Sequence, residues 1–161
     1  MPEIAIRPAM PEDAPALAAL RFEFRSSLRT TRESEHAFVA RCADWMHERL
    51  SLGNGAWKCW LAQHEHRAVG HLWIQVVEKI PNPSLELEQH AYLTNFYVRD
   101  TLRGTGVGTR MLSAALEWCD GRGVDVVFLW PTARSRPLYE RHGFVAADAV
   151  LTRQLAQHRR S

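Results

Sequence analysis

The sequence predicts an α/β fold in which helices cover both faces of a mixed, mostly antiparallel central sheet. Short β-like apolar runs and helical stretches follow one another in the order strand, two helices, several strands, helix, strand. The 161 residues, 46% of them hydrophobic and 24% charged, have an ordinary globular composition and are enough for one core. The chain has no internal repeat, linker or low-complexity segment. We therefore expect one domain over residues 1–161.

The N-terminal third predicts one strand and two helices. Residues 4–6 form a short β-like run, and Pro11 opens a helix. Four apolar residues of this first helix recur at helical spacing: Leu17, Leu20, Phe24 and Leu28. Thr30 and Glu33 match a capping box for the second helix. Its apolar stripe comprises Phe38, Cys42, Trp45, Met46 and Leu50.

The middle of the chain predicts an antiparallel hairpin. Gly53, Asn54 and Gly55 break the second helix, and residues 57–62 then alternate as in a strand. The polar segment 63–67 separates this strand from residues 69–77. In that second strand one set of alternating residues, Leu72, Ile74 and Val76, shares a face, and His71, Trp73 and Gln75 share the other.

The C-terminal half predicts a strand, helix, strand unit followed by a last short helix and strand. Residues 92–98 form the first strand of the unit. A buried helical stripe follows, made of Val107, Met111, Leu112, Ala115, Leu116 and Cys119. Residues 124–130 are almost continuously apolar, which is typical of a strand covered on both faces.

Composition removes several classes of function. The formal net charge is only +2 and the basic residues are spread along the chain, so nucleic acid is not an expected partner. Three cysteines without CxxC spacing and eight histidines without ligand spacing predict neither disulfides nor a metal site. No apolar run has the length of a signal peptide core or a membrane span. We expect a cytoplasmic protein that does not bind membranes.

Three alternating glycines, Gly104, Gly106 and Gly108, stand between a predicted strand and a predicted helix. Glycine lets the backbone approach an anion closely, and successive amides at a helix N-terminus attract it. A dinucleotide fingerprint would need a third glycine at the position of Thr109, and a P-loop would need Lys and then Ser or Thr after Gly108. Neither alternative fits, but a pyrophosphate site does.

With its neighbours, this turn resembles the signature of the GNAT superfamily of acyl-CoA-dependent N-acyltransferases. Residues 103–108 match the pattern of Arg or Gln, two residues, Gly, one residue, then Gly or Ala. Phe96-Tyr97-Val98 lies upstream at the expected spacing, and residues 138–144 look like the C-terminal motif of the family. The resemblance covers residues 92–144 and implies a GNAT-like fold and an acetyl-CoA-dependent enzyme.

The resemblance also implies roles for single residues. The backbone of Phe96, Tyr97 and Val98 would pair with the pantetheine arm, and the Val98 amide could stabilise the oxyanion. The pyrophosphate would be held by the amides of Arg103, Gly104, Thr105, Gly106, Val107, Gly108 and Thr109. Tyr139 would protonate the departing thiolate. Thr132 stands where many relatives have an asparagine that contacts the cofactor, and Ser135 could offer a hydroxyl instead.

The acceptor side is less defined. Some relatives place a glutamate where this chain has Tyr92, so the general base stays unassigned, with Glu86, Glu88 and His90 as upstream candidates. For the acceptor pocket we select Phe24, Trp73, Glu88 and His90 by location. We expect transfer to a primary amine of a small molecule in a ternary complex.

Three alternatives stay open at this point. The acceptor could be a protein lysine or N-terminal amine instead of a small molecule. The chain could also be a non-catalytic acyl-CoA-binding sensor, which would bind the cofactor without turning it over. The resemblance further allows a homodimer, since dimers are common in the family.

Overall fold

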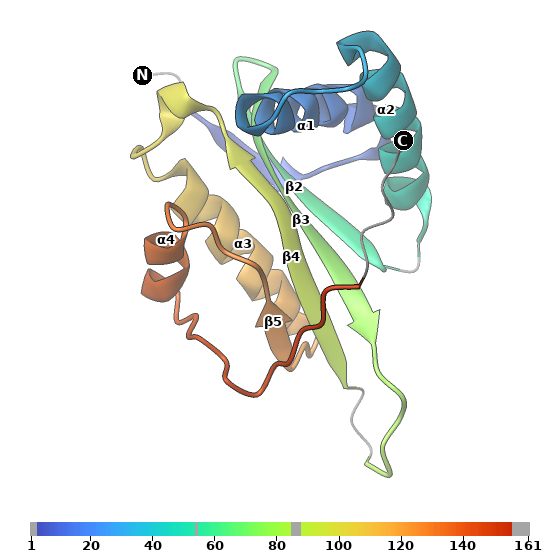
Figure 1. Cartoon of the computed structure of the whole chain (residues 1–161), viewed down its shortest axis with the longest axis vertical. Coiled ribbons are helices and arrows are strands. Elements are labelled where there is room, and N and C mark those ends of the chain that lie inside the picture. Colours follow the sequence, from blue (N-terminus) through green and yellow to red (C-terminus); the bar gives the residue numbers. More distant parts are fainter. Residues whose placement is uncertain (1–2, 54, 85–87, 156–161) are drawn as a thin grey trace. The chain divides into compact units, whose positions relative to one another are not determined.

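A computed structural model describes residues 3–53, 55–84 and 88–155. The chain divides into two compact units, residues 1–130 and 131–161. The first unit contains a five-stranded sheet with three helices and two short 3-10 turns (Figure 1). Its elements are β1 (Ala5–Pro8), η1 (Pro11–Asp13), α1 (Ala14–Leu28), α2 (Glu35–Ser51), β2 (Trp57–His64), β3 (Arg67–Glu78), β4 (Gln89–Val98), η2 (Asp100–Leu102), α3 (Val107–Gly121) and β5 (Val126–Phe128).

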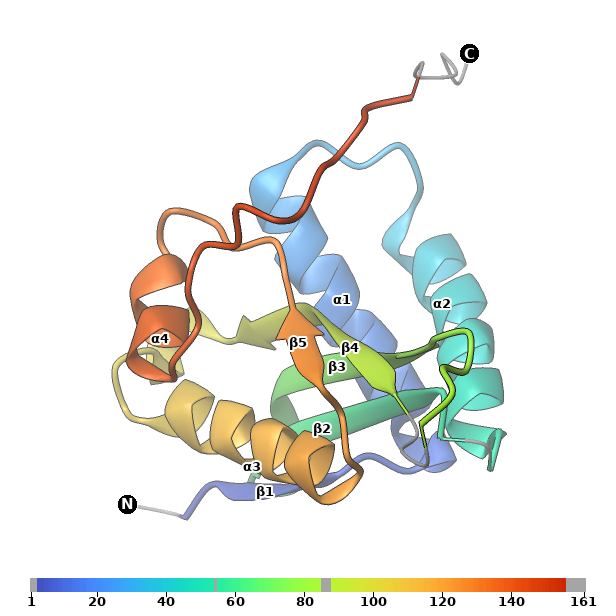
Figure 2. The same ribbon diagram turned by 90° about the horizontal axis from the view of Figure 1, so that it is seen from below.

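The sheet has the simple strand order β1-β2-β3-β4-β5. The first three pairings are antiparallel, and β4 pairs with β5 in parallel. Helices α1 and α2 lie on one face of the sheet and α3 lies on the other (Figure 2). This arrangement confirms the predicted fold class.

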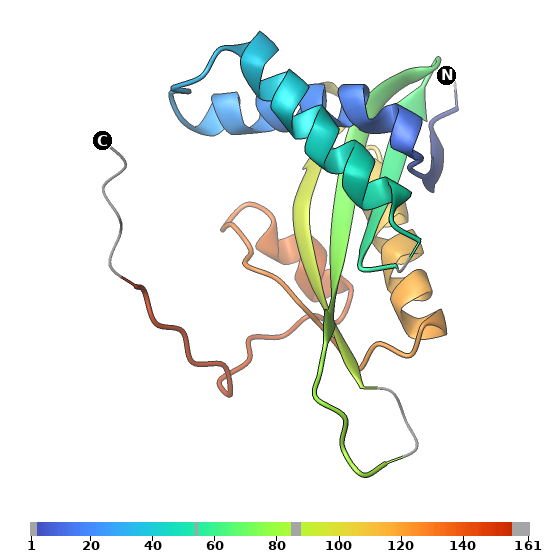
Figure 3. The ribbon, with the colours of Figure 1, turned by 90° about the vertical axis from the view of Figure 1, so that its right-hand side faces the viewer.

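The β2–β3 hairpin sets which side chains face which helices. Its two turn residues, Glu65 and His66, both have positive φ, which is the backbone geometry that suits a two-residue hairpin. The resulting register places Cys59 opposite Trp73. Both residues join the core cluster beneath α1 and α2, two helices that lie side by side on this face (Figure 3).

The other face of the sheet packs against α3. Helix α3 buries five residues, Val107, Met111, Leu112, Ala115 and Cys119, as its apolar stripe predicted. Leu72 and Ile74 of β3 are fully buried, and Trp60 of β2 meets Trp118 edge to face at 5.7 Å. Leu116, also assigned to the stripe, is only half-buried.

Helix α2 does not begin with the predicted capping box. Its N-cap is Ser34, whose side chain accepts a hydrogen bond from the Ala37 amide at 3.2 Å. Glu33 instead pairs with Arg41 at 2.8 Å. Thr30 lies four residues too early, because residues 29–34 form the connection between α1 and α2 rather than the first turn of α2.

Two further predictions in the N-terminal unit are wrong. Strand β5 is short and stands at the edge of the sheet, so Val126 is 48% exposed and the strand is not covered on both faces. Leu28, the last residue of the predicted apolar stripe, ends α1 and is 56% exposed, so the buried face of the helix is shorter than the stripe.

The second unit holds one short helix, α4 (Arg136–Arg141). Gly143 follows it with φ of +84°, and the amides of Gly143 and Phe144 bond to Glu140 and Tyr139 carbonyls in a Schellman-type ending. The ring of Tyr139 packs on that of Phe144 at 5.5 Å. The strand predicted after this helix is absent from the described residues 145–155.

Candidate functional site

The glycine turn leads directly into α3. Gly104 and Gly106 have φ of +75° and +87°, in the left-handed region where glycine carries no steric penalty. Gly106 is the N-cap of α3, and no side chain of the described residues caps the helix there. The first amides of a helix have no intrahelical acceptor. An external anion is therefore the partner that this terminus suits.

Side chains beside the turn hold its shape. Arg103 donates from Nε to the Val98 carbonyl at 3.3 Å and pairs with Asp100 at 2.8 Å. The Thr105 hydroxyl donates to the Leu102 carbonyl. These contacts tie the turn to the end of β4. Gly108 and Thr109 lie in the first turn of α3, where Val107 is buried and anchors the helix.

Strand β4 contains a β-bulge just before this turn. Trp73 pairs with Thr94 and His71 pairs with Tyr97, so two residues of β4 lie opposite one residue of β3. Asn95, one of the two, has φ of +52°. A bulge re-aims side chains and interrupts the ladder, and such irregularities gather near functional sites. The other bulge residue, Phe96, is the first residue of the predicted pantetheine segment, Phe96 to Val98.

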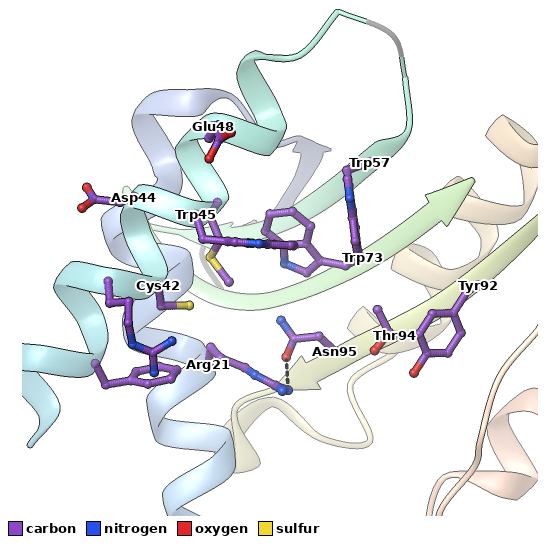
Figure 4. A pocket seen from close by; sticks show the side chains of 13 residues that line it. Arg21, Cys42, Asp44, Trp45, Glu48, Trp57, Trp73, Tyr92, Thr94 and Asn95 are labelled. Atoms are coloured by element: carbon purple, nitrogen blue, oxygen red, sulfur yellow. Dashed lines mark hydrogen bonds between the residues drawn. The ribbon is translucent and has the colours of Figure 1, made fainter. Parts of the chain in front are cut away.

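A cavity of ≈ 600 Å³ lies on the α1/α2 side of the sheet, within the range usual for small-molecule sites. Trp45 of α2, Trp57 of β2 and Trp73 of β3 gather at one end of it (Figure 4). Arg21 of α1 and Asn95 of the bulge line the other part. The remaining lining residues are Phe38, Arg41, Cys42, Asp44, Met46, Glu48, Tyr92 and Thr94.

Arg21 is the half-buried cation of this cavity. Its Nη1 donates to Asn95 Oδ1 at 3.1 Å, a contact drawn in Figure 4. Burial and the nearby charge of Arg25 lower the pKa of Arg21. The described carboxylates form seven ion pairs with basic side chains, and none of these involves Arg21. The guanidinium thus has a neutral amide as its recorded partner.

His71 lies fully buried beside Trp73 on the same strand face. The Trp73 indole donates to His71 Nδ1 at 3.4 Å. Because an indole nitrogen only donates, Nδ1 must accept and the proton sits on Nε2, which has no partner among the described residues. Burial, with a smaller effect from Arg21, lowers the pKa of His71 to about 3. His71 is therefore neutral at physiological pH.

The residues selected for the acceptor are dispersed. Trp73 lines the cavity, whereas Phe24 stacks on Tyr97 at 5.0 Å. Glu88 pairs with Lys79 at 2.8 Å, which lowers its pKa, and His90 packs against the Phe128 ring. Neither Glu88 nor His90 lines the cavity. Glu86 lies outside the described residues.

The predicted residues of the second unit form a local arrangement. The hydroxyls of Thr132 and Ser135 are hydrogen-bonded to each other at 2.9 Å, and each also accepts from the amide of the other residue. Burial raises the pKa of Tyr139 to about 12, which keeps the phenol protonated across the neutral range. The roles assigned to these three residues stay predictions.

Sequence reasoning missed Arg21, Trp45, Trp57 and Asn95 as cavity residues. Trp45 and Trp57 were assigned to helix and sheet packing, and nothing in the pattern of α1 distinguished Arg21 from a surface arginine. The sequence pointed to the cavity only at Tyr92, where some relatives have a glutamate. Tyr92 lines the cavity, and its ring stacks on that of Phe128 at 5.4 Å.

Within residues 3–53, 55–84 and 88–155, no group of histidine, cysteine or acidic side chains could hold a metal ion. The same part of the chain contains no helix long and apolar enough to cross a membrane. The three cysteines are free, with Cys59 and Cys119 buried.

Comparisons with known proteins address the fold and the family. The closely superimposable solved structures include a predicted acetyltransferase from Clostridium acetobutylicum with acetyl-CoA, at a TM-score of 0.78, 20% identity and coverage of 94% of this chain and 96% of that one. A GCN5-related N-acetyltransferase from Ralstonia eutropha has a TM-score of 0.72 and 23% identity, over 96% and 100% of the two chains. Glucosamine-6-phosphate N-acetyltransferase from Arabidopsis thaliana has a TM-score of 0.71 and 14% identity, over 96% of this chain and 99% of that one.

At these identities the structural likeness shows the fold alone. No curated protein gave a significant sequence match. The profile of the Acetyltransferase (GNAT) family, however, matches residues 18–144, which is most of the sequence. This match includes the glycine turn, the bulged strand and Tyr139. The chain therefore belongs to the GNAT acetyltransferase family.

Proposed function

We propose that the protein transfers the acetyl group of acetyl-CoA to a primary amine of a small molecule, by direct attack within a ternary complex. The observation that carries this proposal is the uncapped N-terminus of α3, which follows the two left-handed glycines Gly104 and Gly106. A Cβ built on either glycine would meet nothing within 4 Å, so close packing does not explain their presence. Their left-handed backbone requires glycine, and the turn that it forms leaves successive amides at the start of α3 for an anion.

In the proposed site the amides of residues 104–109 bind the pyrophosphate, and the backbone of Phe96, Tyr97 and Val98 pairs with the pantetheine arm. The Arg103 amide, which the sequence also assigned to the pyrophosphate, instead donates to the Asp100 carbonyl at 3.2 Å. Acetyl-CoA supplies the activated thioester carbonyl. The amine nitrogen of the acceptor attacks this carbon, the new C–N bond forms, and the C–S bond breaks as its electron pair leaves on sulfur. We assign to the Val98 amide the hydrogen bond to the carbonyl oxygen as that oxygen gains negative charge.

Three proton transfers balance this reaction. The acceptor nitrogen loses one proton before attack, and the departing thiolate gains one. The nitrogen loses a second proton after the C–N bond forms, which restores the donor of the thiolate's proton. An alkylamine is mostly protonated at neutral pH and must lose a proton before attack, for which water in the cavity is the simplest acceptor. The departing thiolate gains a proton, which we assign to the Tyr139 hydroxyl. A phenol with a pKa of about 12 is always available as a donor, but it is a weaker acid than an unperturbed tyrosine. Transfer would therefore accompany C–S cleavage.

A small acceptor is supported by the size of the cavity and by two relatives of like fold. The cavity volume of ≈ 600 Å³ suits a small-molecule acceptor better than a segment of a protein surface. The Arabidopsis relative is named for glucosamine-6-phosphate, and a soil metagenome relative with a TM-score of 0.70 is named an aminoglycoside acetyltransferase. Both names describe small amines.

The first experiment tests the glycine turn. Gly106→Ala should weaken acetyl-CoA binding, measured by titration calorimetry, because the new Cβ disturbs the left-handed cap that aims the amides. Gly123→Ala is the matched control, since Gly123 has φ of +76° and equally open surroundings at the other end of α3. Each variant should lose about 1 kcal/mol of stability. Equal acetyl-CoA affinity in both variants would remove the support for this site.

The second experiment tests turnover. Thiol release from acetyl-CoA is measured against a panel of small amines and lysine peptides, for the unaltered protein and for Tyr139→Phe, which keeps the ring that packs on Phe144. We expect turnover with one amine class and a lower kcat in the variant. Tight acetyl-CoA binding without turnover of any amine would instead indicate an acyl-CoA-binding module.

A further inference from the structure

We propose that the cavity takes its acceptor as an α-amino acid with a large aromatic side chain, whose carboxylate binds Arg21 and whose ring packs against the cluster formed by Trp45, Trp57 and Trp73. This inference rests on the proposed function and deepens it by naming the substrate class. Three observations support it. Arg21 has no ion-pair partner among the described residues, the cavity walls opposite it are aromatic, and Arg21 lies beside the β4 bulge.

The charge of Arg21 is the first step. A half-buried guanidinium gives up hydration and needs compensation, yet its recorded contact is the neutral side chain of Asn95 at 3.1 Å. Arg25 adds positive potential nearby and lowers the pKa of Arg21 further. A guanidinium also carries five N–H donors in a fork that fits the two oxygens of a carboxylate. An anionic ligand group is the missing partner.

The other charged residues of the lining do not compete for that role. Arg41 is already paired with Glu33 at 2.8 Å, and Glu48 with Arg49 at 2.8 Å. The carboxylate of Asp44 points away from the cavity (Figure 4). Arg21 therefore lines the cavity without taking part in any ion pair of the described residues, and its charge is available to a ligand.

The walls opposite Arg21 are aromatic. The Trp45 ring lies 5.1 Å from that of Trp57 and 6.1 Å from that of Trp73, and Trp57 and Trp73 are 6.2 Å apart. Such a cluster suits a flat apolar group, which packs edge to face with indoles. The guanidinium of Arg49 already lies over Trp45 at 4.8 Å. With Arg21 on the other side, these walls disfavour polycations such as polyamines.

The position of Arg21 selects an α-amino acid over acids whose amine is distant. In an α-amino acid the amine and the carboxylate are attached to the same carbon. The Arg21–Asn95 hydrogen bond holds the guanidinium at the β4 bulge, next to the segment proposed to hold the thioester. A carboxylate bound there keeps the amine beside β4 and leaves the side chain free to extend toward the tryptophans.

The test compares three amines with the same ring: L-phenylalanine, its primary amide and phenethylamine. In the unaltered protein kcat/KM for the acid should exceed that for the amide by about tenfold or more, the ratio expected of a charged hydrogen-bonded contact. The α-amine of the amide is less basic than that of the acid and is more often unprotonated, so its intrinsic reactivity works against this preference. A ratio near or below one would overturn the inference while leaving the proposed function intact.

Arg21→Met should lower kcat/KM for the acid far more than for the amide, so that the acid-to-amide ratio falls to about one. Arg25→Met, which removes a neighbouring cation that does not line the cavity, is the matched control and should keep most of the preference. A preference that survives Arg21→Met would contradict our assignment. If Arg21→Met does not fold, the acid-to-amide ratio of the unaltered protein decides the question.

A binding measurement separates this inference from the proposed function. N-Acetyl-L-phenylalanine should quench tryptophan fluorescence saturably in the unaltered protein and in Arg25→Met, with affinity about tenfold weaker in Arg21→Met. Saturable, Arg21-dependent quenching without turnover of any amine would support the carboxylate site and refute the enzyme. Turnover of phenethylamine without any such quenching would refute the site and support the enzyme.

Discussion

The two faces of the sheet differ in how completely they are filled. The face under α3 is an apolar layer in which Leu72, Met111 and Leu112 are fully buried. The face under α1 and α2 includes a dense cluster around Leu17 and Cys59, but it also encloses the cavity, the half-buried Arg21 and the buried His71. One face is a filled apolar layer, and the other combines a packed cluster with open space and buried polar groups.

This difference matches the division of tasks proposed for the two faces. The glycine turn uses backbone amides, which every residue provides, so it needs only a rigid α3 behind it. Recognition of an acceptor needs particular side chains, and the cavity supplies them from five different elements, α1, α2, β2, β3 and β4. Polar groups in that face lower stability in exchange for specificity.

The largest expected effect contrasts the two faces directly. Leu112→Ala, on the buried face of α3, should lower the free energy of unfolding by about 2–5 kcal/mol because it leaves a void in a filled layer. Trp45→Ala removes more atoms, yet should cost about 2 kcal/mol, at the low end of that range, since Trp45 is 38% exposed and borders space that is already open. Urea unfolding followed by circular dichroism measures both.

Leu17→Ala is the control for this contrast. Leu17 lies on the buried face of α1 and does not line the cavity, so Leu17→Ala should lower the free energy of unfolding about as much as Leu112→Ala. Similar losses for Leu112→Ala and Trp45→Ala would mean that the cavity is closed by packing in solution, and the contrast between the faces would fail.

The next effect concerns pH and the buried His71. Its pKa is about 3 in the folded protein and near 6.5 when unfolded, so between these values the unfolded chain binds the extra proton. Stability is therefore complete above pH 6.5 and falls as pH drops toward 3. From pH 7 to pH 5 the loss should reach about 2 kcal/mol. His71→Leu should remove this component of the pH dependence.

Urea unfolding at pH 7, 6 and 5 measures the slope for the unaltered protein and for His71→Leu. His36→Leu, at an exposed position of α2, is the control and should keep the slope of the unaltered protein. Identical slopes for all three proteins would show that His71 is not held neutral by burial. The unpartnered Nε2 proton would then have found a partner in solution.

The smallest expected effect concerns the N-cap of α2, the helix that supplies much of the cavity lining. Ser34→Ala should cost about 1 kcal/mol, because Ser34 caps the Ala37 amide, whereas Thr30→Ala should be close to neutral. Thermal unfolding distinguishes the two. A larger effect at Thr30 would restore the capping box that the sequence predicts and shift the start of α2.

The local patterns predicted most elements correctly and failed where neighbours decided the outcome. The stripe of α3 and the alternation of β3 were readable because their periods are intrinsic to helix and strand. Residues 124–130 look like a central strand in sequence, but β5 has a partner on one side only. Ser34 and Thr30 are equally good caps by composition, and the length of the connection after α1 selected Ser34.

By itself the sequence determined the glycine turn, its place between a strand and a helix, and thereby the family, because a short contiguous motif carries that chemistry. The cavity was decided by the tertiary structure alone. Arg21 and Asn95 are 74 residues apart and meet because the bulge in β4 turns Asn95 toward α1. Contacts of this range depend on strand register and helix packing, which local periodicity does not encode.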